Sequence, residues 1–141
     1  MIIKQLSVFL ENKSGRLTEV TDTLGEAGIN ISALSIADTS EYGILRMVVS
    51  DPDQALQKLR EKQFSVSLTD VACLSTPNES GALAKALKIL SQAKISIAYM
   101  YAFSMGEKAL VVIRTENIQD CIDTLKAHKL ELLKASELYQ I

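Results

Sequence analysis

A short polar segment, residues 12–17, has the residue types and the spacing to hold a small charged molecule. It reads Asn-Lys-Ser-Gly-Arg-Leu and lies between a predicted strand and apolar positions at helical spacing. The first N–H groups of a helix have no partners within the helix, so such a terminus favours an anion, for instance a carboxylate. Gly15 permits a positive φ and a close approach to the backbone. Asn12 offers both a donor and acceptors, which suits a zwitterion.

The same segment also has a purely structural interpretation, in which Asn12 and Ser14 cap the helix and turn the chain. Taken alone, the segment favours this structural interpretation, because both residue types are common at helix starts whether or not a ligand binds. Other features of the chain must decide between the two.

Residues suited to catalysis, metal binding or cofactor binding are sparse. The single histidine, His128, lies near the end of a predicted helix, where a positive charge is favourable. Cys73 and Cys121 lie far apart without a second thiol or a basic partner nearby, which indicates two buried apolar side chains. No glycine-rich phosphate loop of the usual pattern occurs. We therefore expect no enzyme, no metal and no cofactor.

The composition is that of a globular protein without a basic surface. Of the 141 residues, 48% are hydrophobic and 23% are charged, and the net charge is -2. An acidic chain of this kind is not expected to bind nucleic acid or an anionic membrane. The apolar stretches are too short to span a bilayer, and residues 1–5 lack the features of a signal peptide. We therefore expect a cytoplasmic protein without a disulfide framework.

The chain contains an internal repeat with an offset of 66 residues, which places Gly15 on Gly81. At this offset the pattern Asn-x-Ser-Gly-x-Leu recurs without a gap at residues 78–83. Apolar positions match further along, namely Leu24 with Leu90, Ile29 with Ile95, Ile31 with Ile97 and Leu59 with Leu125. Chance explains the apolar matches more easily than it explains a polar block in register with them. The pattern therefore predicts a true duplication.

Both copies predict the order strand, helix, strand, strand, helix, strand. In the first copy we expect strands at residues 2–10, from 29, at 44–49 and at 64–68, with helices at 17–27 and from 51 and a turn-rich connection at 38–43. In the second copy we expect strands at 71–75, 95–103, 109–115 and within 130–138, with helices at 82–93 and 118–128. This βαββαβ order is an α+β, ferredoxin-like arrangement, in which both helices lie on one face of an antiparallel sheet.

The two copies are joined without a flexible linker. The predicted strand from residue 64 runs into the strand that ends at residue 75, with no Gly or Pro between them. A module of about 65 residues is near the size at which one core becomes marginal alone. We therefore expect domains at residues 1–68 and 69–141 that pack rigidly on each other as a pseudo-dimer. One long shared strand, or an exchange of terminal strands, would connect them.

The motifs of the first copy resemble the signature of ACT domains, regulatory domains named for aspartate kinase, chorismate mutase and prephenate dehydrogenase. The family pattern is an Asn-x-x-Gly-x-Leu turn followed by a Gly-hydrophobic-Asn-Ile strand start, and residues 12–17 and 28–31 match it. ACT domains have the βαββαβ fold and bind amino acids at the interface between two modules. The resemblance covers essentially the whole chain, in two copies.

Carried over by position, the resemblance implies ligand-binding residues in both copies. These are Asn12, Ser14, Gly15, Arg16, Leu17, Asn30 and Ile31 in the first copy, and Asn78, Ser80, Gly81, Leu83, Ser96 and Ile97 in the second. The second copy departs from the pattern, because Ser96 replaces the amide of Asn30. Some family members have a histidine two residues before the loop Asn, where this chain has Leu10 and Thr76. We expect at least one occupied site, but not two equal ones.

The resemblance implies a non-catalytic regulatory protein that binds a small amino acid and signals allosterically to a separate metabolic enzyme or transporter. Two alternatives stay open: a protein–protein interaction scaffold without a ligand, and an acylphosphatase-like enzyme, which has the same topology but has less support. An RNA-binding module of this strand order needs aromatic residues on the sheet, and strands 44–49 and 109–115 contain none. The sequence leaves a homodimer open and does not identify the amino acid.

Overall fold

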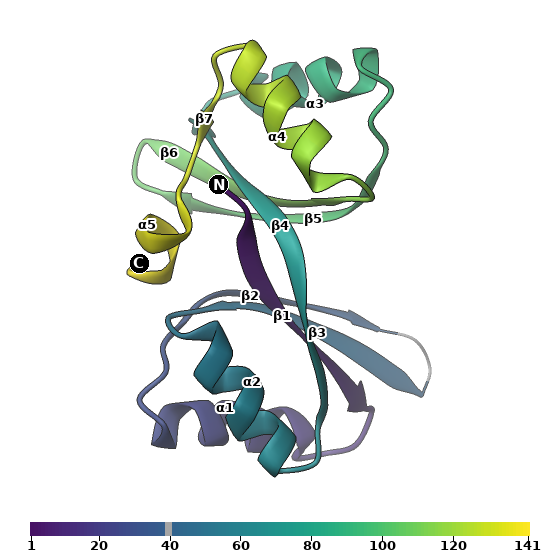
Figure 1. Ribbon diagram of the computed structural model, residues 1–141, viewed down its shortest axis with the longest axis vertical. Helices are drawn as coiled ribbons and strands as arrows, with labels where there is room; N and C mark the ends of the chain where they lie inside the picture. The colour runs from purple at the N-terminus through teal and green to yellow at the C-terminus, as the bar shows by residue number, and fades with distance from the viewer. Residues whose placement is uncertain (39–40) are drawn as a thin grey trace. The chain divides into compact units, whose positions relative to one another are not determined.

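The structure, a computed structural model, describes residues 1–38 and 41–141 and contains two compact units (Figure 1). Module 1 consists of Lys4–Thr69 with Leu138–Ile141, and module 2 consists of Asp70–Glu137 with Met1–Ile3. The α+β class and the two modules of βαββαβ type are confirmed. Part of the predicted turn at 38–43, Thr39 and Ser40, lies outside the described residues.

Module 1 places two helices on one face of an antiparallel sheet (Figure 1). Its elements are β1 (Ile3–Glu11), α1 (Arg16–Glu26), β2 (Ile31–Asp38), β3 (Tyr42–Val49), α2 (Pro52–Glu61) and the first part of β4 (Ser65–Pro77). The strand order is β2-β3-β1-β4, and β3 pairs antiparallel with both β1 and β2. Helices α1 and α2 contact each other above the sheet.

Module 2 repeats this arrangement. Its elements are the second part of β4, α3 (Ala82–Gln92), β5 (Ile97–Met105), β6 (Lys108–Thr115), α4 (Ile118–Ala127) and β7 (Glu131–Leu132). β6 lies between β5 and β4, and β7 pairs with the other edge of β4. The short helix α5 (Ala135–Tyr139) follows β7.

Each module buries its own apolar core between the helices and the sheet. On β1 the buried side chains Leu6, Val8 and Leu10 alternate with exposed or half-buried ones, as expected for a strand with one covered face. They pack with Val20 and Leu24 of α1, which recur at helical spacing. The corresponding core of module 2 comprises Ala72, Leu74, Ala86, Leu90, Val111, Ile113, Ile118, Cys121, Ile122, Leu125 and Leu132.

Backbone geometry confirms the duplication, because left-handed residues recur at the 66-residue offset. Gly15 and Gly81 have φ values of 90° and 87° before α1 and α3. After the first helix of each module, Gly28 and Lys94 have φ values of 72° and 58°. After the second helix, Gln63 and Lys129 have φ values of 67° and 60°. Left-handed residues therefore stand at the same positions before and after the helices in both copies, even where the residue type has changed.

The Gly28 and Lys94 pair predicts two stability changes of opposite sign. Lys94→Gly should raise the free energy of unfolding by about 1 kcal/mol, because a left-handed conformation costs a non-glycine residue roughly 1–2 kcal/mol. Gly28→Ala should lower it by a similar amount, because open space surrounds the added Cβ and only backbone strain opposes it. Urea unfolding of both variants measures these changes. A destabilised Lys94→Gly chain would contradict the expectation.

The connection between the modules follows one of the two predicted forms. β4 runs from Ser65 to Pro77 without a break, so its first residues belong to module 1 and its last to module 2. One long shared strand is therefore confirmed. The rigid packing of the modules as a pseudo-dimer stays a prediction.

The last strand lies within residues 130–138, as predicted, but it is short. Only Glu131 and Leu132 form a strand, and residues 135–139 form the helix α5. The N–H of Lys134 donates to Oε1 of Glu137 at 3.2 Å, which satisfies one of the backbone groups at the start of this helix. Ala135, Glu137 and Leu138 are good helix formers. Local capping and propensity therefore add a helix after the last strand that the repeat did not predict.

Candidate ligand site

The polar segment of module 1 forms a tight turn between β1 and α1. The N–H of Asn12 donates to the carbonyl of Glu41 at 2.9 Å, and the N–H of Lys13 donates to the carbonyl of Glu11 at 2.8 Å. Gly15 then adopts φ 90°, and α1 begins at the next residue. The predicted site residues Asn12, Ser14 and Gly15 are all exposed. The turn therefore presents its polar groups to solvent at the start of a helix.

Module 2 forms the same turn between β4 and α3. The N–H of Asn78 donates to the carbonyl of Glu107 at 2.8 Å, which matches the bond from Asn12 to Glu41 at the 66-residue offset. The side-chain amide of Asn78 also lies 3.5 Å from the carbonyl of Gly106. Ser80 and Gly81 are exposed, and Gly81 has φ 87°. We call the two segments, residues 12–17 and 78–83, the glycine turns.

The helices that follow the glycine turns begin differently from the other two long helices. Asp51 and Asn117 cap α2 and α4, because their side chains accept hydrogen bonds from Gln54 N at 3.1 Å and Asp120 N at 3.2 Å. In contrast, α1 and α3 begin at Gly15 and Gly81, and within the described residues no side chain caps either terminus. The segment therefore turns the chain, as the structural interpretation expected, but the expected capping of α1 by Asn12 and Ser14 is wrong.

Both glycine turns leave room for a bound group. A Cβ placed on Gly15 or Gly81 would meet nothing within 4 Å. Beside the first turn lies an open pocket of about 330 Å³, lined by Glu11, Asn12, Lys13, Glu41 and Tyr42. The Lys13 ammonium lies 2.9 Å from the Glu11 carboxylate, and its hydrogen bond lowers the pKa of that carboxyl group. The pocket thus offers charges of both signs near an uncapped helix terminus.

The remaining residues of the glycine turns are held by their own modules. Nη1 of Arg16 lies 2.9 Å from Oε2 of Glu19, and the guanidinium carbon lies 4.7 Å from the ring centroid of Phe64. Leu83 packs against the core of module 2, whereas Leu17 is 39% exposed. Arg16 and Leu83 therefore have structural contacts, and Leu17 remains accessible to a ligand.

The predicted strand-start residues Asn30 and Ile31 lie where β2 begins. The N–H of Asn30 donates to Oγ of Ser50, and the N–H of Ser50 donates to the carbonyl of Asn30, both at 2.9 Å. These reciprocal bonds fix the start of β2 against the end of β3. The Asn30 side-chain amide donates to a main-chain oxygen of Ile141 at 3.1 Å. Ile31 is half-buried and packs against the core of module 1.

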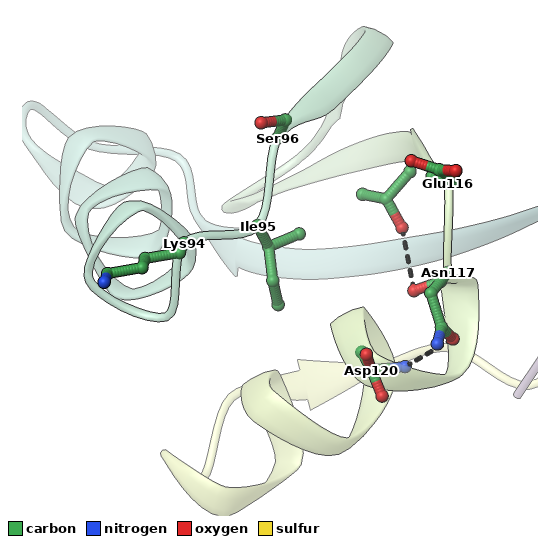
Figure 2. A pocket seen from close by; sticks show the side chains of 7 residues that line it. Lys94, Ile95, Ser96, Glu116, Asn117 and Asp120 are labelled. Carbon is green, nitrogen blue, oxygen red and sulfur yellow. Dashed lines mark hydrogen bonds between the residues drawn. The ribbon is translucent and has the colours of Figure 1, made fainter.

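In module 2 the strand-start residue Ser96 lines a pocket of about 210 Å³ (Figure 2). One side of the pocket is the turn before β5, which carries Lys94, Ile95 and Ser96. Figure 2 shows Glu116, Asn117 and Asp120 on the other side, where α4 begins. Ile97 follows Ser96 as the first residue of β5 and is half-buried.

Strand register separates the glycine turn from the strand start of the same module. In module 1 Glu11 pairs with Tyr42, whereas Ile31 pairs with Val49 at the other end of β3. In module 2 Pro77 pairs with Lys108, and Ile97 pairs with Thr115. Seven residues of strand span about 23 Å. Each module therefore holds the residues of its glycine turn at one end of the sheet and those of its strand start at the other end. A single amino acid cannot contact the glycine turn and the strand start of the same module.

The histidine and the two cysteines that the sequence analysis considered for catalysis lie at a helix end and in buried positions. His128 is the exposed C-cap of α4, with Nδ1 2.9 Å from the carbonyl of Thr124. Burial raises the pKa of the Cys73 thiol to about 12 and also raises the pKa of Cys121, so both remain protonated at neutral pH. In the described part of the chain, no group of three potential metal ligands occurs. No helix among residues 1–38 and 41–141 has the length and apolarity to cross a membrane.

The sequence analysis did not predict that Asn117 lies beside Ser96 in the pocket, nor the bond from Asn30 to Ile141. The repeat contained a signal for the role of Asn117 as a cap, because Asn117 lies at the 66-residue offset from Asp51 and both cap the second helix of their module. No local signal could have found the bond, since residues 30 and 141 are 111 positions apart.

Comparison with known proteins agrees with this architecture. A family model of an ACT domain pair matches residues 1–141. The crystal structure of protein BT0572 from Bacteroides thetaiotaomicron is 53% identical, with a TM-score of 0.97 and coverage of 100% of this chain and 98% of that chain. Among functionally curated proteins, none matches the chain.

More distant structures share the fold. The regulatory subunit of aspartate kinase from Thermus thermophilus, in a ligand-free form, is 15% identical, with a TM-score of 0.68 and coverage of 89% of this chain and 93% of that chain. The subunit from Thermus flavus is 17% identical, with a TM-score of 0.59 and coverage of 89% and 92%. Fold and site thus define this class of protein: a duplicated βαββαβ chain with a glycine turn in each copy. The chain belongs to the family of ACT domain pairs.

Proposed function

We propose that this chain is a non-catalytic regulatory protein that binds a small amino acid. The amino acid lies between the glycine turn of one ACT module and the strand start of another, and its binding is signalled to a separate metabolic enzyme or transporter in the cytoplasm. The observation that carries the proposal is the contrast between helix starts. α2 and α4 have side-chain caps, whereas α1 and α3 begin at exposed left-handed glycines and have no such cap from residues 1–38 or 41–141.

The chemistry of the first glycine turn suits a zwitterion. The N–H groups at the start of α1 attract a carboxylate, and the helix dipole adds roughly 0.3–1 kcal/mol to that attraction. Oδ1 of Asn12 and the carboxylates of Glu11 and Glu41 are acceptors for an ammonium group beside the same pocket. Because Lys13 lowers the pKa of Glu11, that carboxylate stays charged at neutral pH.

The separation of the two groups of site residues supports a site made by two modules. A glycine turn and the strand start of its own module lie about 23 Å apart along the sheet. A ligand of amino-acid size can therefore use both kinds of residue only when they come from different modules, as the family resemblance implies. An effect on a partner then requires that the partner-bound and free states bind the amino acid with different affinities.

The proposal is tested by thermal unfolding in the presence of each of the twenty amino acids at millimolar concentration. An amino acid at a hundred times its Kd should add about 2.7 kcal/mol of stability. For a chain of this size that corresponds to a rise in Tm of roughly 5–10 °C. Asn12→Ala should abolish most of the rise, whereas Gln92→Ala, which removes an exposed amide at the far end of α3, should preserve it.

A protein–protein interaction scaffold remains a second candidate, because module 1 exposes large apolar side chains. Phe9, Leu34 and Ile36 are each close to half exposed, and the ring of Phe9 lies 5.0 Å from that of Tyr42. Absence of any stabilisation in the amino-acid series would favour this candidate. The acylphosphatase-like alternative loses support, because the Arg16 guanidinium pairs with Glu19 and stacks on Phe64 rather than facing a phosphate site.

A further inference from the structure

Residues 138–141 form a strap across the start of β2 in module 1. A main-chain oxygen of Ile141 accepts a hydrogen bond from Nδ2 of Asn30 at 3.1 Å. Oγ of Ser32 lies 3.4 Å from this oxygen and 3.4 Å from the carbonyl oxygen of Leu138. The side-chain donors at this strand start therefore already have main-chain acceptors from the chain itself.

The strap is anchored by two side chains. Leu138 is fully buried. It lies outside the core cluster of module 1 that the described residues form. The Tyr139 hydroxyl accepts a hydrogen bond from the N–H of Lys4 at 2.9 Å and lies 3.4 Å from the carbonyl of Lys4. Burial raises the pKa of Tyr139, so the phenol stays protonated and can donate to that carbonyl. These contacts hold residues 138 and 139, at the start of the strap, beside module 1.

We propose that the strap competes with the amino acid for the strand start of module 1. This inference rests on the proposed function, in which the Asn30 amide would donate to a polar group of the amino acid. The main-chain oxygen of Ile141 already accepts from that donor, so binding of the amino acid at Asn30 requires the strap to leave. A site whose competent form is populated one time in ten binds with an apparent affinity about tenfold weaker than its intrinsic affinity.

According to this proposal, the strand starts of the two modules differ in how readily they bind the amino acid. Ser96 lines an open pocket of about 210 Å³ in module 2, whereas its counterpart Asn30 is bonded to the strap in module 1. The amino acid then binds first at the site that uses Ser96. The site that uses Asn30 fills only when the strap opens, so the strap sets the concentration at which the second amino acid binds.

Equilibrium dialysis with each of the twenty amino acids, radiolabelled, tests the strap. Leu138→Ala removes the apolar anchor, and Tyr139→Phe removes the bonds to Lys4 as a milder second variant. We expect the weaker of the two sites to bind about tenfold more tightly in Leu138→Ala and by a smaller factor in Tyr139→Phe. Gln140→Ala, an exposed change within the same strap, is the matched control and should leave binding within about twofold of the unaltered chain.

The outcomes separate this inference from the proposed function. If an amino acid binds the unaltered chain, Leu138→Ala and Tyr139→Phe equally at both sites, the strap proposal is wrong and the regulatory function stands. If no amino acid binds any of the chains, both proposals are wrong. If amino-acid binding also speeds hydrogen exchange at the amides of residues 138–141, displacement of the strap is established by a second readout.

Discussion

Replacing Leu24 with alanine should lower the free energy of unfolding by about 3 kcal/mol, because a fully buried leucine leaves both lost transfer energy and a cavity. The corresponding fall in Tm is roughly 10 °C for a chain of this size. Leu90, at the same position of module 2, is 1% exposed, and Leu90→Ala should have a similar effect. Urea and thermal unfolding measure both changes.

These two variants also test whether the modules unfold as one unit. If the predicted rigid packing of the modules is correct, Leu24→Ala and Leu90→Ala each shift a single transition that all probes share. Two separated transitions, with only one displaced by each substitution, would show independent modules. Leu17→Ala is the matched control on α1, because Leu17 is 39% exposed and its loss should change stability by no more than about 0.5 kcal/mol. A loss that small in Leu24→Ala would contradict the assigned core.

Replacing Gly15 with valine should have the largest effect on ligand binding. Gly15 has φ 90°, a conformation that costs a β-branched residue on the order of 2 kcal/mol, so the turn must either strain or rearrange. Rearrangement moves the first N–H groups of α1 away from the carboxylate that we propose they bind. We therefore expect at least tenfold weaker amino-acid binding at this turn, measured by isothermal titration.

The control for Gly15→Val is a glycine within the helix that follows Gly15. Gly25 lies within α1, and a Cβ there meets nothing within 4 Å. Gly25→Ala should leave binding unchanged and raise stability by up to about 1 kcal/mol, because alanine is the better helix former. Unchanged binding in Gly15→Val would show that the first glycine turn is not the carboxylate site.

Local sequence patterns predicted most of the fold, because the spacing of apolar residues within one element determines which of its sides is buried. The alternation of Leu6, Val8 and Leu10 and the spacing of Val20 and Leu24 each show which side of an element is buried. The repeat then placed the same elements in module 2. It also placed the final strand, but not the helix at residues 135–139, which depends on its own helical propensity and on the bond from Lys134 to Glu137.

The candidate site could be predicted only in part. The glycine turns follow from Gly15 and Gly81, since few other residues adopt their positive φ. The sequence pattern did not show that Asn12 leaves α1 uncapped, nor that Arg16 pairs with Glu19 and stacks on Phe64. The strap over Asn30 depends on a contact across 111 positions, which no periodicity encodes.

The proposed carboxylate site is tested most sharply by nitrogen–proton correlation spectra of the isotope-labelled chain, titrated with the amino acid that stabilises it most. If the glycine turns bind the carboxylate, the largest chemical-shift changes fall on the backbone amides that begin α1 or α3, at Arg16 and Leu17 or at Ala82 and Leu83. If those amides stay fixed while others shift, or if no amide shifts with any of the twenty amino acids, the glycine turns do not hold an amino acid.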